Sequence, residues 1–265
     1  MAQQKFAAPR GLEADFRRKL RDVARFIGGI VKEHSDGEGG LVDELGMAEA
    51  LRRYSELLDP WAKLVVSRLV NQIGTSNLRY WERASVAMGQ RLRTSLATTE
   101  VGRVARELQA AQVELIKSLP IKAGQRAQSI AATAATSGIR SSDIAYAVRE
   151  LDRTGEVTEA RATLIARTEV AKTHSAITRA RADFVGSTHY IWRTMLDAEV
   201  RESHAELEGE VFAFDDPPDI EGEGPHGPGE FPNCRCFAEP IIVESQLDAA
   251  REGRYQAAGR YDLDI

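Results

Sequence analysis

The chain has 265 residues, enough for one large domain or two modest ones. A hydrophobic content of 43% supports a buried core, and an aromatic content of only 6% with abundant alanine, leucine, arginine and glutamate favours helices over a β-sandwich. The net charge of −5 excludes a surface that is basic throughout. No run of about 18 apolar residues occurs, and residues 1–10 lack the apolar core of a signal peptide, so we expect no membrane contact.

Hydrophobic periodicity predicts six or seven helices with short connections between residues 11 and 186. Pro60 and Pro120 are expected to end helices, because proline lacks the backbone donor and clashes with the preceding turn. Gly74 is expected to kink or divide the third helix, and Gly186 to end the last one. The expected helices cover residues 11–32, 41–58, 61–92, 99–118, 142–152 and 159–184.

After residue 187 the pattern changes to short segments rich in aromatic and β-branched residues, which predict strands over 189–194, 211–214 and 237–243. A short helix is expected over 198–207, and a terminal helix or tail over 246–258. The predicted fold is therefore mainly α, with long amphipathic helices first and a small C-terminal α+β unit after residue 187.

Candidate metal ligands gather in the C-terminal unit. Cys234 and Cys236 are the two cysteines of the chain, and their sulfur atoms together with the imidazole of His204 suit Zn²⁺. A helix would place Asp197 and His204 two turns apart on one face, so a further ligand is Asp197, His226 or water. The alternative is that both cysteines fill the core from one face of a strand. A disulfide between them would be strained and would close almost no loop, which fits a reducing compartment.

A second set of residues raises the possibility of hydrolysis. Asp197, Glu199, His204 and Glu206 combine carboxylates and imidazole, the groups that hold a metal or perform acid–base catalysis on a phosphodiester. A metal-dependent nuclease or toxin-like enzyme is therefore an alternative function. No recognised nuclease or protease motif accompanies the set, and no catalytic residue is assigned.

The predicted helix over 159–184 is rich in cations. Arginine side chains suit phosphate contacts, so a sequence-independent DNA-binding module is a second alternative. Neighbouring acidic residues, Glu169 and Asp183, make a network of salt bridges an equally good interpretation. The candidate nucleic-acid contacts are Arg161, Arg167, Lys172, Arg179 and Arg181.

Several motifs in a fixed order resemble one known family. They are the run RATLIARTE at 161–169, Trp192, Thr194, Asp197, Val200, Arg201, His204, Gly209 and the run PNCRC at 232–236. Together they resemble the phage Mu F-like minor head protein family, or head morphogenesis family, over roughly residues 100–243. The resemblance implies a Mu F-like domain at 100–245. It does not extend to residues 1–99, for which the apolar periodicity predicts a helical N-terminal region, and a tail is expected at 246–265.

What the resemblance implies is a structural role, not an enzymatic one. Such a protein is a minor, portal-associated component of the head of a tailed phage or prophage. It acts in head assembly and in DNA packaging or ejection, with the portal protein, the major capsid or scaffold protein and DNA as expected partners. It is expected in the virion, in the head interior or at the portal vertex, and in the host cytoplasm during assembly. The family's Asp, His and Cys positions match Asp197, His204, Cys234 and Cys236, which implies one zinc ion as the expected cofactor. The helices of residues 1–99 are expected to dock on the portal or the capsid wall.

Overall fold

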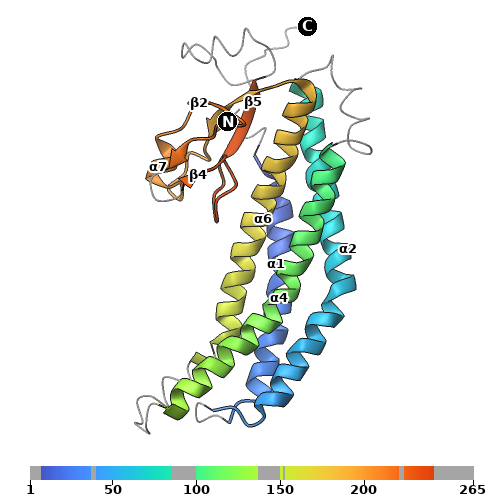
Figure 1. Cartoon of the computed structure of the whole chain (residues 1–265), viewed down its shortest axis with the longest axis vertical. Helices are drawn as coiled ribbons and strands as arrows, with labels where there is room; N and C mark the ends of the chain where they lie inside the picture. Colours follow the sequence, from blue (N-terminus) through green and yellow to red (C-terminus); the bar gives the residue numbers. More distant parts are fainter. Residues whose placement is uncertain are drawn as a thin grey trace. The chain divides into compact units, whose positions relative to one another are not determined.

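Long helices come first along the chain, and short strands follow (Figure 1). The structure is a computed structural model that describes residues 7–36, 40–84, 100–136, 150–151, 153–220 and 224–241. Among these residues, the long helices are α1 (Arg10–Glu33), α2 (Glu44–Ala84), α4 (Glu100–Thr136) and α6 (Thr154–Val185). The shorter elements are β1 (His189–Arg193), α7 (Glu202–Ala205), β2 (Val211–Ala213), β3 (Asp219–Ile220), β4 (Gly224–Pro225) and β5 (Phe237–Ile241). This order confirms the predicted fold class.

Two compact units share the long helices. Unit 1 consists of Met1–Glu13, Leu69–Leu108 and Arg167–Ile265, and unit 2 consists of Ala14–Arg68 and Gln109–Ala166. The domain boundaries expected at residues 99 and 245 remain predictions. None of the helices in the described ranges combines the length and the apolar character that a membrane crossing requires.

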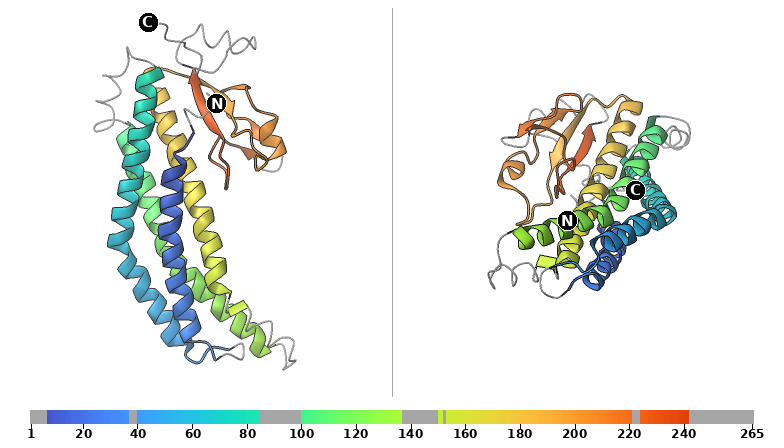
Figure 2. Two further views of the ribbon diagram at one scale, coloured as in Figure 1. Left: turned by 180° about the vertical axis from the view of Figure 1, so that it is seen from behind. Right: turned by 60° about the horizontal axis from the view of Figure 1, so that its bottom comes forward.

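The predicted helix ends at the two prolines are wrong. Helix α2 runs through Pro60 and Gly74, and helix α4 runs through Pro120. In the left view of Figure 2, α2 is drawn as one continuous ribbon in blue to cyan. Proline removes one backbone hydrogen bond, but the apolar face of each helix continues past it and stays buried. On α4 this face is formed by Ile116, Leu119, Ala123 and Ala127. The helices expected over 142–152 and 246–258 lie largely or wholly outside the described residues.

In unit 2, α1 buries one apolar stripe, which confirms the predicted amphipathic helix. Gly28 allows a close helix contact, because a Cβ atom there would lie only 2.8 Å from the Cα atom of Gly155 in α6. Glu159 of α6 accepts hydrogen bonds from Arg21 at 2.8 Å and from Arg25 at 3.1 Å. The buried stripe of α1 consists of Phe16, Leu20, Val23, Ala24, Ile27 and Val31.

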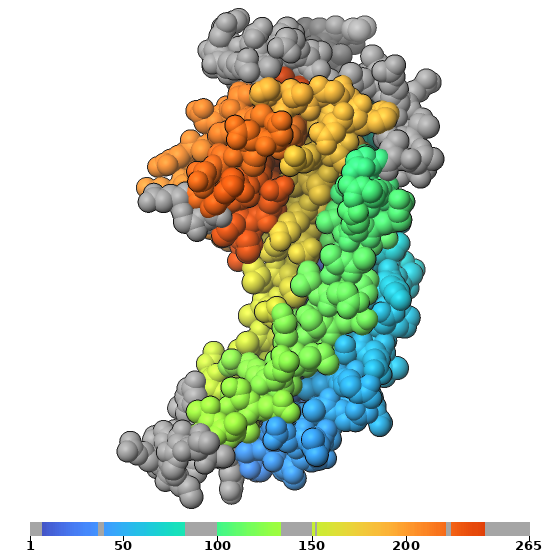
Figure 3. Space-filling view, viewed as in Figure 1, coloured from blue at the N-terminus to red at the C-terminus, as the bar shows by residue number. Residues whose placement is uncertain are grey.

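In unit 1, three antiparallel strands form a sheet in the order β2-β1-β5. The central strand β1 is covered on both faces. Tyr190 and Trp192 point into the larger core cluster, which also contains Cys234 and Cys236, while Ile191 packs in a smaller cluster on the other side. The sheet and its loops, orange to red in Figure 3, form one packed region.

Helix α6 leads into this sheet through a tight turn. Gly186 has a φ of +76°, a left-handed conformation that favours glycine, and it ends the helix as predicted. The hydroxyl of Ser187 then donates a hydrogen bond to the carbonyl oxygen of Ile241 at 2.6 Å. This bond fastens the end of β5 beside the start of β1.

Candidate metal centre

The structure brings His204, Cys234 and Cys236 together in the interior of unit 1. The His204 side chain comes from the short helix α7, and the cysteines come from the segment that leads into β5. All three residues are buried, with exposed fractions of 1%, 3% and 6%. Their ligand atoms lie within 4.8 Å of one another.

The spacing of these atoms fits a tetrahedral zinc site. His204 Nδ1 lies 3.4 Å from Cys234 Sγ and 3.6 Å from Cys236 Sγ. A zinc ion bound at about 2.3 Å to sulfur and about 2.0 Å to nitrogen would place such atoms about 3.6 Å apart. The cysteines also belong to the hydrophobic core cluster, so their role in the core and their fit to a metal are compatible.

Hydrogen bonds shift the pKa values of the two thiols in opposite directions. The pKa of Cys234 lies well below its usual range. The largest cause is the hydrogen bond with the Cys236 thiol, and the His204 ring and the backbone amides of Cys236 and Gly229 add to it. The pKa of Cys236 is raised, because its thiol bonds Cys234 and because it is buried. Cys234 is therefore the more acidic thiol of the pair, and thiolate is the form that binds metals.

The segment before Cys234 is held from several sides. Asn233 has a φ of +63°, and its backbone N–H donates to the hydroxyl oxygen of Thr168 in α6 at 3.2 Å. Arg201 donates to the carbonyl oxygen of Pro232 at 2.9 Å. The sulfur atom of Cys234 accepts a hydrogen bond from the backbone N–H of Gly229 at 3.4 Å. The position of the sulfur atoms is therefore fixed by contacts outside the three candidate ligands.

Asp197 is not part of this cluster, so its prediction as a ligand is corrected. Its carboxylate accepts two hydrogen bonds from Arg235, at 2.8 and 2.5 Å, and this contact holds the pKa of Asp197 below its usual range. The expected helix over 198–207 begins only at Glu202. Leu196 has a φ of +52°, and the following residues form turns, so Asp197 and His204 do not share a helix face.

The other members of the predicted hydrolytic set do not converge either. Glu199 pairs with Arg235 at 3.1 Å and is largely exposed, and Glu206 is exposed. Among the described residues, the metal-compatible cluster therefore contains His204 and the cysteines but no carboxylate.

A pocket of about 220 Å³ borders the cluster. Its walls contain three cations and one anion in addition to the three candidate ligands. Sequence reasoning did not single out Arg235 for this site. The pocket is lined by Arg167, Glu199, Val200, Arg201, His204, Asn233, Cys234, Arg235 and Cys236.

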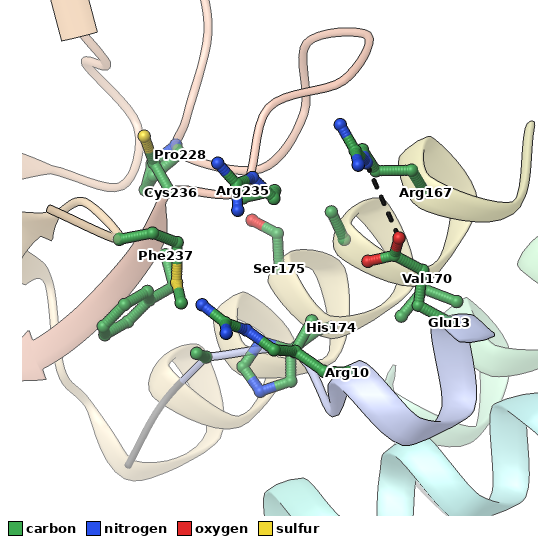
Figure 4. Close-up of a pocket in the computed structure, with 14 residues that line it drawn as sticks. Arg10, Glu13, Arg167, Val170, His174, Ser175, Pro228, Arg235, Cys236 and Phe237 are labelled. Atoms are coloured by element: carbon green, nitrogen blue, oxygen red, sulfur yellow. Dashed lines mark ion pairs between the residues drawn. The ribbon is translucent and has the colours of Figure 1, made fainter. Parts of the chain in front are cut away.

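A second, smaller cavity lies between the start of α1, helix α6 and the start of β5 (Figure 4). Figure 4 shows Glu13 facing Arg167, with which it forms an ion pair at 3.5 Å, while His174 and Cys236 line the same cavity. Its volume of about 30 Å³ matches one water molecule. This cavity is therefore a packing feature and not a ligand site.

A buried ion pair supports the sheet next to the cluster, and sequence reasoning missed it. Arg193 of β1 donates to Glu239 of β5 at 2.6 Å and to Glu208 at 3.2 Å. The carboxylate of Glu208 also accepts the backbone N–H of Thr194 at 2.5 Å. No sequence pattern marks this pair, because its members are brought together only by the strand register, in which Arg193 lies opposite Phe237.

The predicted nucleic-acid contact at Arg181 is wrong. Arg181 is fully buried, and its guanidinium donates to the side-chain oxygen of Asn77 and, at 2.9 Å, to the carbonyl oxygen of Gly74. The Asn77 amide nitrogen in turn contacts His174 Nε2 at 3.2 Å and the Thr178 hydroxyl at 2.8 Å. Arg181 therefore belongs to an internal polar network and is closed to a phosphate.

The other predicted cations of α6 differ in exposure. Arg161 and Arg179 are exposed, and Lys172 is half-buried. Arg167 is engaged by Glu13, as its ion pair shows. The exposed cations remain available for a phosphate, and nucleic-acid contact at these positions remains a prediction.

The described chain thus combines long helices with a small α+β unit that contains a buried His-Cys-Cys cluster. Residues 125–239 match the family described as phage Mu protein F like protein. The resemblance predicted from the sequence is confirmed over this segment, which contains the whole cluster. This match supports a role in phage head morphogenesis.

One relative adds sequence similarity but no function. A protein of Haemophilus influenzae (strain ATCC 51907 / DSM 11121 / KW20 / Rd), with the name "Uncharacterized protein", is 36% identical over 139 residues. The match covers 52% of this chain, and the chain spans only 30% of the relative. No solved structure matches the chain.

Proposed function

We propose that this chain is a minor head protein of a tailed phage or prophage that binds the portal protein and acts in head assembly and DNA packaging or ejection. The match of residues 125–239 to the phage Mu F-like family carries this proposal. The buried cluster adds support, because among the described residues it contains the sulfur and imidazole groups of a metal-binding site and no carboxylate.

The portal contact is assigned to an exposed apolar groove in unit 2. Phe26 of α1 and Leu57 of α2 are 57% and 73% exposed, and the ring of Phe26 packs on that of Tyr54 at 4.6 Å. Exposed apolar groups that gather in one patch mark an interaction site. The groove has a volume of about 650 Å³ and is lined by Phe26, Ile30, Gly46, Glu49, Ala50, Arg53, Tyr54 and Leu57.

The shape and charge of the groove fit a helix of the portal protein. Ala50, Leu57 and the exposed Leu64 follow one another at seven-residue spacing along α2, so they form a stripe parallel to the helix axis. An amphipathic helix laid along such a stripe buries its own apolar face. Glu49 and Arg53 at the rim offer both signs of charge to its polar edges.

Copurification with the portal protein tests this proposal. The wild-type chain is expected to copurify with portal rings, and Leu57→Glu is expected to weaken binding at least tenfold by placing a charge in the groove. Leu164→Glu is the control, since Leu164 is an exposed apolar residue of unit 2 outside the groove. A wild-type chain that stays monomeric in the presence of the portal overturns the function. Equal binding by Leu57→Glu overturns only the assignment of the groove.

We also propose that the cluster of His204, Cys234 and Cys236 holds one zinc ion. Their atom types and spacing support this assignment. A bound zinc ion would fasten α7 to the segment before β5 and would add its binding free energy to the stability of the fold. Elemental analysis of the purified protein tests this assignment, with about one zinc per chain expected in the wild type and clearly less in Cys234→Ser.

A further inference from the structure

The three ligands of the cluster leave one tetrahedral position to be filled. Structural zinc sites fill all four positions with protein atoms, whereas catalytic sites keep one for water. Asp197 is excluded from this position by its bonds to Arg235. The fourth group must therefore come from another side chain near the cluster or from the neighbouring pocket.

His226 is the candidate side chain for this fourth position. Its ring centre lies 6.0 Å from that of His204. Two imidazoles bound to one tetrahedral zinc ion have ring centres roughly 5 Å apart. His226 lies outside the group whose ligand atoms are within 4.8 Å of one another, so its ring would have to turn towards the cluster to enter the zinc shell.

The hydrogen bonds of His226 prepare one of its nitrogens for this role. Its Nδ1 lies 2.8 Å from the carbonyl oxygen of Gly224. A carbonyl oxygen only accepts, so Nδ1 carries the proton and Nε2 keeps its lone pair. Histidines that bind metals are typically oriented in this way, by a hydrogen bond from the other ring nitrogen to a carbonyl or carboxylate. The Nε2 atom is buried.

Neighbouring side chains and the backbone position the His226 ring. The ring of Phe231 stacks on that of His226 at 5.0 Å, and the Arg201 guanidinium lies over the Phe231 ring, 4.9 Å from its centre. The backbone N–H of His226 donates to the carbonyl oxygen of Pro218 at 3.3 Å. These contacts therefore keep the His226 ring beside that of His204.

We propose that His226, through Nε2, is the fourth ligand and completes a closed site of two histidines and two cysteines. The inference rests on the zinc site proposed above. It makes the site structural, because no position is left for a substrate or a water molecule. The competing arrangement is an open site, in which a water molecule or an anion from the arginine-lined pocket takes the fourth position.

Cobalt substitution distinguishes these arrangements. Co²⁺ bound to the wild-type chain should show the intense visible bands of a tetrahedral ion and sulfur charge-transfer bands for two thiolates. His226→Ala should weaken Co²⁺ binding at least tenfold and shift the visible bands. His34→Ala is the matched control, since His34 also bonds a carbonyl through Nδ1, that of Ile30 at 2.8 Å, but lies in unit 2. It should bind Co²⁺ like the wild type.

A second variant covers the case in which His226→Ala does not fold. His226→Cys should bind Co²⁺ with charge-transfer intensity about one and a half times that of the wild type, since three thiolates replace two. An unchanged spectrum in His226→Cys, or bands of the wild type that shift on addition of inorganic phosphate, would overturn the role of His226. A wild-type chain that binds neither Zn²⁺ nor Co²⁺ would instead overturn the zinc site itself.

Discussion

His204 Nδ1 lies 3.4 Å from Cys234 Sγ, although 30 residues separate them in the chain. The contact joins the short helix α7 to the segment before β5, and it is buried on both sides. Because the sheet alone has few residues, a fastening at this point bears on the stability of the whole α+β unit. It also allows the metal to be separated experimentally from packing.

Chelation should destabilise the wild-type chain but not Cys234→Ser. A ligand that binds only the folded state adds about 4 kcal/mol when its concentration is a thousand times its dissociation constant. The wild type is therefore expected to show a clearly lower thermal unfolding midpoint after removal of zinc. Cys234→Ser should unfold at the same temperature with and without a chelator. If the wild type is equally indifferent, the cysteines serve only as core residues.

Arg193→Met should destabilise the protein strongly, because it removes the cation that bonds the buried carboxylate of Glu239. Removing one partner of a buried ion pair costs about 3–5 kcal/mol. The double variant Arg193→Met/Glu239→Met should recover part of this loss, since the Glu239 carboxylate no longer lies buried beside an apolar side chain. Denaturant unfolding measures both. Arg52→Met, at an exposed pair with Glu56, is the control and should change the free energy of unfolding by less than about 1 kcal/mol.

His174 should make the protein less stable as the pH falls. Burial and the nearby Arg181 lower its pKa to about 4, from 6.5 in the unfolded chain. The unfolded state therefore binds more protons between these values, so the contribution of neutral His174 is complete above pH 6.5 and is lost as the pH falls towards 4. We expect a loss of about 2 kcal/mol between pH 7 and pH 5.

Urea unfolding at several pH values measures this loss. His174→Gln keeps a polar group but cannot titrate, so its free energy of unfolding should vary less over the same range. An identical slope in His174→Gln and the wild type would show that other groups cause the pH dependence.

Gly229→Ala should disturb the segment that presents the sulfur atoms. Gly229 has a φ of +85°, and a Cβ atom there would lie 3.0 Å from the carbonyl oxygen of Cys236 and 3.4 Å from that of Ala171. A left-handed backbone costs about 1 kcal/mol or more for a residue with a side chain. Gly186→Ala shares the positive φ but meets no atom within 4 Å, so it isolates the cost of the backbone. Gly229→Ala should lose more stability than Gly186→Ala, and only Gly229→Ala should weaken zinc binding.

Local patterns in the sequence were sufficient for much of the fold. The three- and four-residue spacing of apolar side chains predicted α1, and the aromatic, β-branched run at 189–194 predicted β1. Each pattern works because it reports which side of a single element is buried. Ordered motifs around His204 and the PNCRC run also identified the family.

The local rule that a proline ends a helix fails at two positions of this chain. Pro60 and Pro120 lie inside helices, because the buried apolar faces on both sides of them stabilise a continuous helix more than one lost hydrogen bond weakens it. That balance depends on what the faces pack against. The sequence shows where each proline lies, but it does not show which residues its helix packs against.

The sequence by itself determined which residue types were available for the site: one imidazole at 204, two thiols at 234 and 236, and a carboxylate at 197. Only the tertiary structure decided their use. It placed His204 against both sulfur atoms, paired the Asp197 carboxylate with the Arg235 guanidinium and buried Arg181 in contact with Asn77. The reason is physical: a hydrogen bond or an ion pair depends on distances of about 3 Å, and such distances between remote residues exist only after the chain has packed.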